Sequence, residues 1–420
     1  MAKCCGDGNG NPSPADACGS RQPSAPQRSS PDDAAAETPC SWFSHMIPNC
    51  LQYANAAKAQ GRPIVCILCE YTPRELIMAA GGVPVCLCGG SAETAAAAEA
   101  HLPANLCPLI KSTFGYGVLG RNPFLEMADL VVGETTCDGK KKMFELMAES
   151  RPMVVLELPQ KSDSADDLEQ WVTELEKFRT YLENRYQVKI TAEKIREAMA
   201  VMNRERALRR ELATLMQTDT PPMTGRQLLD FKSTISGIPA DLIQYERAIE
   251  QLRAKCPDPD LSSRVRVLMT GVPQVYGAER VIDIIERSGG LVVCMENCTG
   301  LKPLLEDTDP TAADPIRALA EKYYRLPCSV MTPNDRRFDT LRQLADQYRP
   351  LCVIELIWQA CITYDVESAR VKRLVEQDLG LPYLKIETDY SPSDSARIAT
   401  RVEALFETVR AADGTSPCRR

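Results

Sequence analysis

The sequence predicts an α/β fold built from two similar Rossmann-like domains, each a doubly wound parallel sheet, with a helical segment between them. Two observations predict this fold. Short apolar segments rich in β-branched residues alternate with amphipathic helices in two separate stretches of the chain. In both stretches a strand runs into a single cysteine, which a helix and another strand follow. We therefore expect a disordered tail at residues 1–38, an N-terminal α/β domain at 39–163, a helical segment at 164–260 and a C-terminal α/β domain at 261–420.

The expected tail is rich in Pro, Ser, Ala, Gly and Asp and shows no hydrophobic periodicity. Such a composition cannot bury enough apolar surface to offset the entropy of the chain. Its cysteines, Cys4, Cys5 and Cys18, are most simply free thiols.

The N-terminal α/β unit opens with a buried strand and a helix whose start is marked. Thr72 is the expected N-cap, and Pro73 takes the first helical position, where a missing N–H costs nothing. Two glycines at 81 and 82 end the helix before the next strand. The expected elements are, in order, a strand at 62–69, a helix at 72–80, strands at 83–87 and 130–134, a helix at 139–149 and a strand at 153–158.

The helical segment and the second α/β unit follow. Between about 164 and 255, apolar residues recur three and four apart among many charges, which is typical of long helices with one solvated face. The second unit then repeats the pattern of the first, and Cys361 takes the place of Cys137. The expected elements are a strand at 264–271, a helix at 278–288, a strand at 291–294, a helix at 315–324, a strand at 353–358, a helix at 366–379 and a strand at 383–387.

Composition limits the class of function. The net charge of -8 gives no basic surface for nucleic acid. No run of about 18 apolar residues predicts a membrane span, and the polar, glycine-rich start is unlike a signal peptide, so we expect a cytoplasmic protein. The chain has 18 cysteines and 2 histidines. Because cytosolic thiols stay reduced, these cysteines indicate metal ligands or buried apolar thiols rather than disulfides, and an all-thiolate site is favoured over a mixed Cys and His site.

Six cysteines are candidate ligands. Cys294 and Cys298, in VCMENCTG, follow an apolar strand into a loop. Cys107 and Cys137 each precede the start of a helix, where free N–H groups favour a thiolate. Cys361 also follows an apolar strand, whereas Cys328 follows a helix and lies between prolines, where an extended backbone can direct its thiol into a cleft. For Cys137 taken alone, a structural free thiol is as good an interpretation as a ligand.

The other thiols favour packing. Cys66 and Cys69 form a Cys-x-x-Cys, but they fall inside an expected strand where residues three apart face opposite ways, so we expect core positions. Cys86 and Cys88 share one face of a strand end, and packing is the favoured interpretation there too.

These segments together resemble the 2-hydroxyacyl-CoA dehydratase D-component family, and most closely its double-cubane cluster branch. The stretches that carry the resemblance span most of residues 60–410: NLCPLIKS, PFLEMADLVVGETTCDGKKKMFELM, LELPQ, VCMENCTGLKP, PCSVMTPN and QACITYDVESARVKRLVEQDLGLPYLKIETDYS. The tail lies outside it.

The resemblance implies cofactors and partners. It places the three thiolates of a [4Fe–4S] cluster on Cys107, Cys137 and Cys361, and three further thiolates of a double-cubane [8Fe–9S] cluster on Cys294, Cys298 and Cys328, although an exchange with a thiol such as Cys86 stays open. It also implies a homodimer and a separate ATP-hydrolysing [4Fe–4S] activator. The absence of a GxxxxGK[ST] motif in this chain fits a partner that hydrolyses ATP.

Three interpretations follow. The leading one is a low-potential reductase of a small substrate, with Glu134 and Glu296 as residues that tune or protonate, each as readily a structural hydrogen-bond acceptor. The second is an (R)-2-hydroxyacyl-CoA dehydratase subunit with a single [4Fe–4S] cluster. The third is a non-catalytic cluster-storage or zinc-stabilised scaffold protein, which Glu296 between two cysteines argues against.

Overall fold

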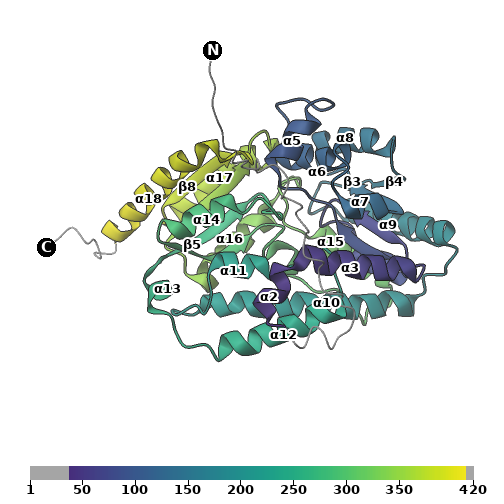
Figure 1. Cartoon of the computed structure of the whole chain (residues 1–420), viewed down its shortest axis with the longest axis horizontal. Coiled ribbons are helices and arrows are strands. Elements are labelled where there is room, and N and C mark those ends of the chain that lie inside the picture. Colours follow the sequence, from purple (N-terminus) through teal and green to yellow (C-terminus); the bar gives the residue numbers. More distant parts are fainter. Residues whose placement is uncertain (1–36, 413–420) are drawn as a thin grey trace, which may run out of the picture.

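The computed structural model describes residues 37–412 and shows two α/β lobes above a layer of long helices (Figure 1). Each lobe contains a four-stranded sheet whose strands are all parallel. The first sheet has the order β2-β1-β3-β4, and the second has the order β6-β5-β7-β8, so the two sheets share one topology. Their strands are β1 (Ile64–Ile67), β2 (Val83–Cys86), β3 (Leu130–Glu134), β4 (Met153–Leu156), β5 (Val265–Gly271), β6 (Gly290–Glu296), β7 (Cys352–Trp358) and β8 (Tyr383–Thr388). The predicted α/β class and the repeat are therefore confirmed.

The helices before β1 and between the strands of the first sheet are α2 (Pro39–Ser44), α3 (Met46–Ala59), α4 (Arg74–Ala79), α5 (Ala92–Ala98), α6 (Pro108–Val118), α7 (Pro123–Met127) and α8 (Asp138–Ala148). Those from α3 to α8 belong to the first lobe, whereas α2 packs against α12 (Pro239–Arg253) and buries Trp42 and Phe43 in the same apolar core as Leu268 of β5. Helices α5 and α6 pack so closely that a Cβ on Gly115 would lie 1.8 Å from the Thr94 carbonyl oxygen.

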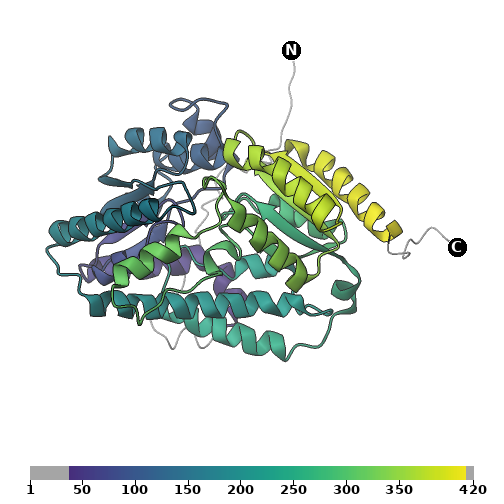
Figure 2. The ribbon, with the colours of Figure 1, turned by 180° about the vertical axis from the view of Figure 1, so that it is seen from behind.

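The segment that connects the two lobes contains α9 (Ala165–Tyr186), α10 (Ala192–Thr214), the 3-10 turn η1 (Leu215–Gln217), α11 (Gly225–Asp230), α12 (Pro239–Arg253) and α13 (Pro259–Ser263). The long helices α10 and α12 run beneath both lobes (Figures 1 and 2), whereas α9 packs beside the first sheet, where Trp171 and Phe178 share an apolar core with Leu130 of β3. Helix α10 contacts α4 of the first lobe and α12 beside it.

The second lobe completes the fold. Besides its strands it contains α14 (Arg280–Arg287), η2 (Lys302–Leu304), α15 (Pro315–Tyr324), α16 (Asp335–Tyr348), α17 (Ile362–Arg373), the π-helical turn η3 (Leu374–Asp378), η4 (Pro392–Asp394) and α18 (Ser395–Ala412). None of the helices within residues 37–412 is long and apolar enough to cross a membrane.

One helix of the second half belongs to the first lobe by its contacts. Helix α15 packs against α9, and Ile316, Leu319 and Tyr323 are buried in the same apolar core as Trp171 of α9 and Leu130 of β3. The segment after α15 therefore carries Cys328 to the strand ends of the first sheet.

Local structure differs from the sequence predictions at three places. Strand β1 ends at Ile67, so Cys69 lies beyond the strand rather than inside it. Helix α4 begins at Arg74, and the Thr72 hydroxyl donates to Glu134 instead of capping the helix. Helix α17 starts directly after Cys361, four residues earlier than the apolar spacing predicts. Residues 1–36 of the expected tail lie outside the described part of the chain.

Candidate functional site

Three of the predicted thiols meet at helix starts. Cys107, Cys137 and Cys361 are the N-cap residues of α6, α8 and α17, with Pro108 at the first position of α6. We name them the first thiol group. The Cys361 thiol donates a hydrogen bond to the Cys107 sulfur, which lowers the pKa of Cys107 and raises that of Cys361. Each thiol therefore stands where unpaired backbone N–H groups and the positive end of a helix dipole favour a thiolate.

A second set of three thiols lies around Tyr71. The pKa of the Tyr71 hydroxyl is raised first by burial and then by the nearby sulfurs of Cys328, Cys69 and Cys298. The pKa values of Cys69 and Cys298 are likewise raised, first by burial and to a smaller extent by the charge of the nearby Cys328. We name Cys69, Cys298 and Cys328 the second thiol group.

The two groups adjoin. Cys328 of the second group raises the pKa of Cys137 of the first, although burial contributes more. The Lys140 ammonium lies between them: it donates a 2.7 Å hydrogen bond to the Leu68 carbonyl, and its charge opposes the rise that burial causes in the pKa values of Cys69 and Cys137. A half-buried cation beside Cys69, Cys107 and Cys137 stabilises the thiolate form of these neighbours.

Cys294, by contrast, lies away from both groups. Strand β6 continues to Glu296, so Cys294 is inside the strand, where helix α16 covers it. It is 1% exposed in an apolar core with Phe338 and Leu341 of that helix. Burial raises its pKa first and the charge of Glu296 second. The structure thus brings five of the six predicted ligands together and adds Cys69, which the sequence reasoning placed in the core.

The position of Cys69 had one signal in the sequence. A Glu-Tyr-Thr-Pro segment follows it directly, and a proline at 73 restricts the chain just ahead of a helix start, so the strand has room to end before the second cysteine of the Cys-x-x-Cys. The partner Cys66 is fully buried in β1 and its pKa is raised by burial, as predicted for a core residue.

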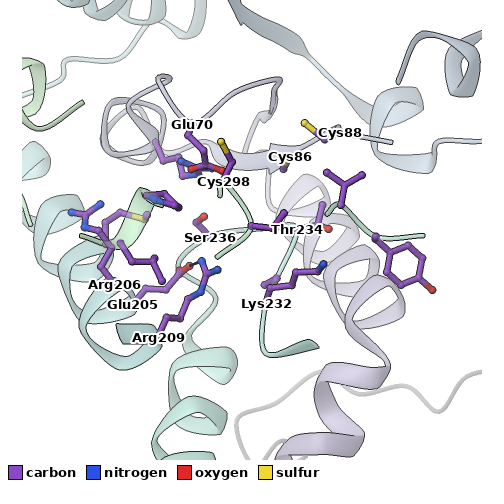
Figure 3. Close-up of a pocket in the computed structure, with 18 of the residues that line it drawn as sticks. Glu70, Cys86, Cys88, Glu205, Arg206, Arg209, Lys232, Thr234, Ser236 and Cys298 are labelled. Atoms are coloured by element: carbon purple, nitrogen blue, oxygen red, sulfur yellow. Dashed lines mark ion pairs between the residues drawn. The ribbon is translucent and has the colours of Figure 1, made fainter. Parts of the chain in front are cut away.

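Cys86 and Cys88 form a further pair at the end of β2. The Cys88 thiol donates a hydrogen bond to Cys86, and this bond is the main cause of a Cys86 pKa lowered to about 7. Both line a cavity of about 110 Å³ with Cys298, and Figure 3 shows the three sulfurs on one side of it. Arg209 and Lys232 lie on the other side of that view.

The two predicted carboxylates are both fully buried at strand ends. Glu134 ends β3, accepts from Thr72, and has an Oε2 atom without a hydrogen-bond partner in the described residues. Burial raises its pKa, and Lys140 opposes that rise. Glu296 ends β6 and pairs with Lys302 at 3.1 Å and Arg337 at 3.3 Å. Glu134 therefore lies close to the thiol groups with one carboxyl oxygen that is unpartnered in residues 37–412, whereas Glu296 is held in an ion-pair network.

The donor chemistry suits a cluster better than a single ion. Within residues 37–412, no group of three or more His, Cys, Asp or Glu side chains is arranged to hold one metal ion. The thiolates of an iron–sulfur cluster bind different iron atoms, so they need not converge on one point. Six buried or half-buried cysteines in two adjoining groups of three, with no histidine among them, fit that requirement.

Comparison with known proteins places the chain in a family. The family described as 2-hydroxyglutaryl-CoA dehydratase, D-component, matches residues 69–409. A protein of Escherichia coli (strain K12) named "Putative dehydratase subunit YjiM" is 41% identical over 362 residues, which cover 83% of this chain and 92% of that protein.

Two more distant relatives cover the chain to a similar extent. The lactoyl-CoA dehydratase subunit beta of Anaerotignum propionicum is 28% identical, over 83% of this chain and 92% of its own length. The (R)-phenyllactyl-CoA dehydratase beta subunit of Clostridium sporogenes is 22% identical, over 87% of this chain and 97% of its own length. The chain therefore belongs to the 2-hydroxyglutaryl-CoA dehydratase D-component family.

Proposed function

We propose that this chain is an iron–sulfur enzyme whose two thiol groups hold a double-cubane [8Fe–9S] cluster for low-potential reduction of a small substrate. The observation that supports the proposal is the adjoining of the two groups at Cys328 and Cys137. Two bridged cubanes need three protein thiolates each, and a single [4Fe–4S] cluster would leave the second group without a ligand role. In this proposal Cys69 takes the place that the sequence reasoning gave to Cys294.

The cluster would supply single electrons at low potential, and the protein residues would set its surroundings. Lys140 and the starts of α6, α8 and α17 stabilise negative charge on the sulfurs. Tyr71 and the apolar core around it exclude water from the second group, because Tyr71 is 1% exposed. Glu134, whose raised pKa favours the protonated form, can hold a proton beside the first sheet's strand ends.

The partners in this proposal come from the family resemblance. A separate ATP-hydrolysing [4Fe–4S] activator would load the electrons, and a second copy of the chain would complete a homodimer in the cytoplasm. The small substrate would reach the second thiol group through the cavity beside Cys298.

A second candidate function is that of an (R)-2-hydroxyacyl-CoA dehydratase subunit with one [4Fe–4S] cluster on the first thiol group. The relatives favour it, because they are named as dehydratase subunits. This candidate predicts that the second group carries no iron.

Iron and sulfide counts on anaerobically purified protein separate these functions. About eight irons per chain support the double cubane, about four support the dehydratase subunit, and zinc or no metal contradicts both. The serine variants refine the ligand set. We expect Cys298→Ser, Cys328→Ser and Cys69→Ser to lose iron, whereas Cys294→Ser and the exposed control Cys256→Ser keep it. Full iron in Cys69→Ser together with loss in Cys294→Ser would restore the ligand set that the resemblance implied.

A further inference from the structure

The charged side chains that line the cavity beside Cys298 are mostly basic. The cavity lies between the two lobes and helix α10, at the carboxyl ends of β1, β2 and β6, which is where open α/β sheets bind ligands. Its charged lining comprises Arg74, Arg206, Arg209, Lys232 and Lys322 against Glu70 and Glu205. Five cations therefore face two carboxylates.

Two of the cations are closely paired already. Arg74 lies 2.9 Å from Glu70, and Arg206 lies 3.1 Å from Glu75 behind the wall. Even so, the buried Arg206 Nε has no hydrogen-bond partner among the described residues. The positive charge that remains is that of the other three.

Those three cations are weakly paired within residues 37–412. Arg209 lies 3.7 Å from Glu205, and Lys232 lies 3.8 Å from Glu279 and donates a 3.1 Å hydrogen bond to the Gln274 carbonyl. Lys322 contacts the Pro303 carbonyl at 3.4 Å and the Tyr323 ring at 4.1 Å from its centroid. Burial lowers the pKa of Lys232 to about 8 and that of Lys322 to about 7, which shows that each ammonium lacks full compensation. Buried charge of this kind is stabilised by an anion.

The remaining walls complete a polar site with a reactive end. Ser236 and Thr234 supply hydroxyl groups from the loop after α11, and in Figure 3 they lie between the cations and the thiols. Tyr276, 57% exposed, stands at the mouth. The volume of about 110 Å³ is well below the range of about 300–1,000 Å³ that suits drug-sized ligands, so only a small molecule fits.

We infer that this cavity binds a small oxyanion, a carboxylate or a phosphate, through Arg209 and Lys232, with its far end directed at Cys298. An Arg fork and a Lys point charge are the donors that carboxylate and phosphate oxygens prefer. The bound oxyanion would also be the substrate only if the proposed function holds. A cluster on the second thiol group is needed for electrons to reach the cavity at Cys298. The binding itself does not depend on the cluster.

Anaerobic titration calorimetry of the full-length, as-purified protein tests the inference. The probes are acetate, inorganic phosphate and acetamide, which has the size of acetate without its charge. We expect acetate or phosphate to bind and acetamide not to bind, and the tighter of the two identifies the oxyanion. Equal binding of acetamide, or no binding of either anion, would overturn the inference.

Matched variants locate the site. We expect Arg209→Gln and Lys232→Gln each to weaken anion binding by about tenfold or more, because a hydrogen bond to a charged group contributes roughly 1.5–3 kcal/mol. Arg209→Lys, which keeps the positive charge, should retain part of the anion affinity that Arg209→Gln loses. Arg204→Gln is the control, because Arg204 lies on the same helix but is exposed and pairs with Glu246. Circular dichroism confirms folding, and unchanged affinity in both site variants would refute the assignment.

Iron counts on the same samples keep the two proposals apart. Anion binding in a protein without iron would refute the proposed function and leave the oxyanion site standing. Full iron content without anion binding would refute the oxyanion site and leave the proposed function standing.

Discussion

Replacing Arg337 tests how the second lobe holds its buried charges. This side chain is fully buried on α16, and its guanidinium lies 3.3 Å from both Glu296 and Glu355, pairs with Glu367 and donates to Thr270 at 2.9 Å. At an effective dielectric constant of about 20, one such pair at 3.3 Å contributes roughly 5 kcal/mol of Coulomb energy. The free-energy cost of removing these ions from water offsets much of the Coulomb energy of the pairs.

Removal of the guanidinium leaves the carboxylates buried without their partner. We expect Arg337→Met to lower the free energy of unfolding by about 3–5 kcal/mol near pH 7. The loss should depend on pH. Burial raises the pKa of Glu355 and Arg337 opposes the rise, so the variant raises this pKa further. A carboxyl whose folded pKa is raised is destabilising once pH climbs above its unfolded value, and the deficit therefore grows from pH 5 to pH 8.

Urea unfolding followed by far-UV circular dichroism at pH 5 and pH 8 measures both effects. Arg336→Gln is the matched control, because the neighbouring Arg336 is exposed and pairs only across the surface with Glu306 at 2.8 Å. Its free energy of unfolding should change by less than about 0.5 kcal/mol. Equal losses in the two variants, or a deficit in Arg337→Met that shrinks toward pH 8, would refute the reasoning.

Three further variants test local packing and buried charge by the same unfolding measurement. Gly115→Ala should lower the free energy of unfolding by about 1–3 kcal/mol, because its new Cβ would overlap the Thr94 carbonyl. The control is Ala96→Gly, a change on the facing helix that adds no atom. Equal stability of the two variants would contradict this prediction. Lys322→Met should be more stable than the native protein at pH 7. Burial lowers the folded pKa of Lys322 to about 7, so the cost of burying its charge in the native protein falls as pH rises above 7. The difference in free energy of unfolding between variant and native protein should therefore narrow by pH 9.5, and an unchanged difference would exclude the buried charge as its cause. Trp42→Phe removes the 2.8 Å hydrogen bond from the indole to Asp241 and should cost about 1–3 kcal/mol. Burial raises the pKa of Asp241 to about 7 while Trp42 lowers it, so this cost should be larger at pH 8 than at pH 5, and an equal cost at both would argue against a buried carboxylate.

The strands were the part of the fold that the sequence predicted best. All the predicted strands are present, and Leu130–Glu134 matches β3 at both ends, because continuous apolar runs bounded by turn residues mark buried parallel strands. Helix α16 was missed. Its charges outnumber its apolar residues along the chain, and the buried face with Phe338, Leu341 and Leu344 becomes visible only when the helix is packed on β6.

The candidate site was predictable where a ligand follows a strand and precedes a helix. Cys137 and Cys361 fit that rule, and Cys107 is also an N-cap, although it follows the loop after α5 rather than a strand. The second thiol group was not predictable in full, because its membership depends on two long-range facts. Strand β6 runs two residues past Cys294, and α15 leaves its own lobe to bring Cys328 beside Cys69. Neither fact is encoded in local spacing.

The placement of α15 also decides how the chain can move and how it can be divided. Any rotation that pulled the two sheets apart would have to draw Ile316, Leu319 and Tyr323 out of the first lobe's core, and the Tyr323 hydroxyl off Glu75 at 2.7 Å. Helix α15 therefore ties the second half of the chain to the first lobe. A fragment that ends before α15 would lack both a wall of its own core and a sulfur of the second thiol group, so the N-terminal α/β unit is not complete as a separately folding piece.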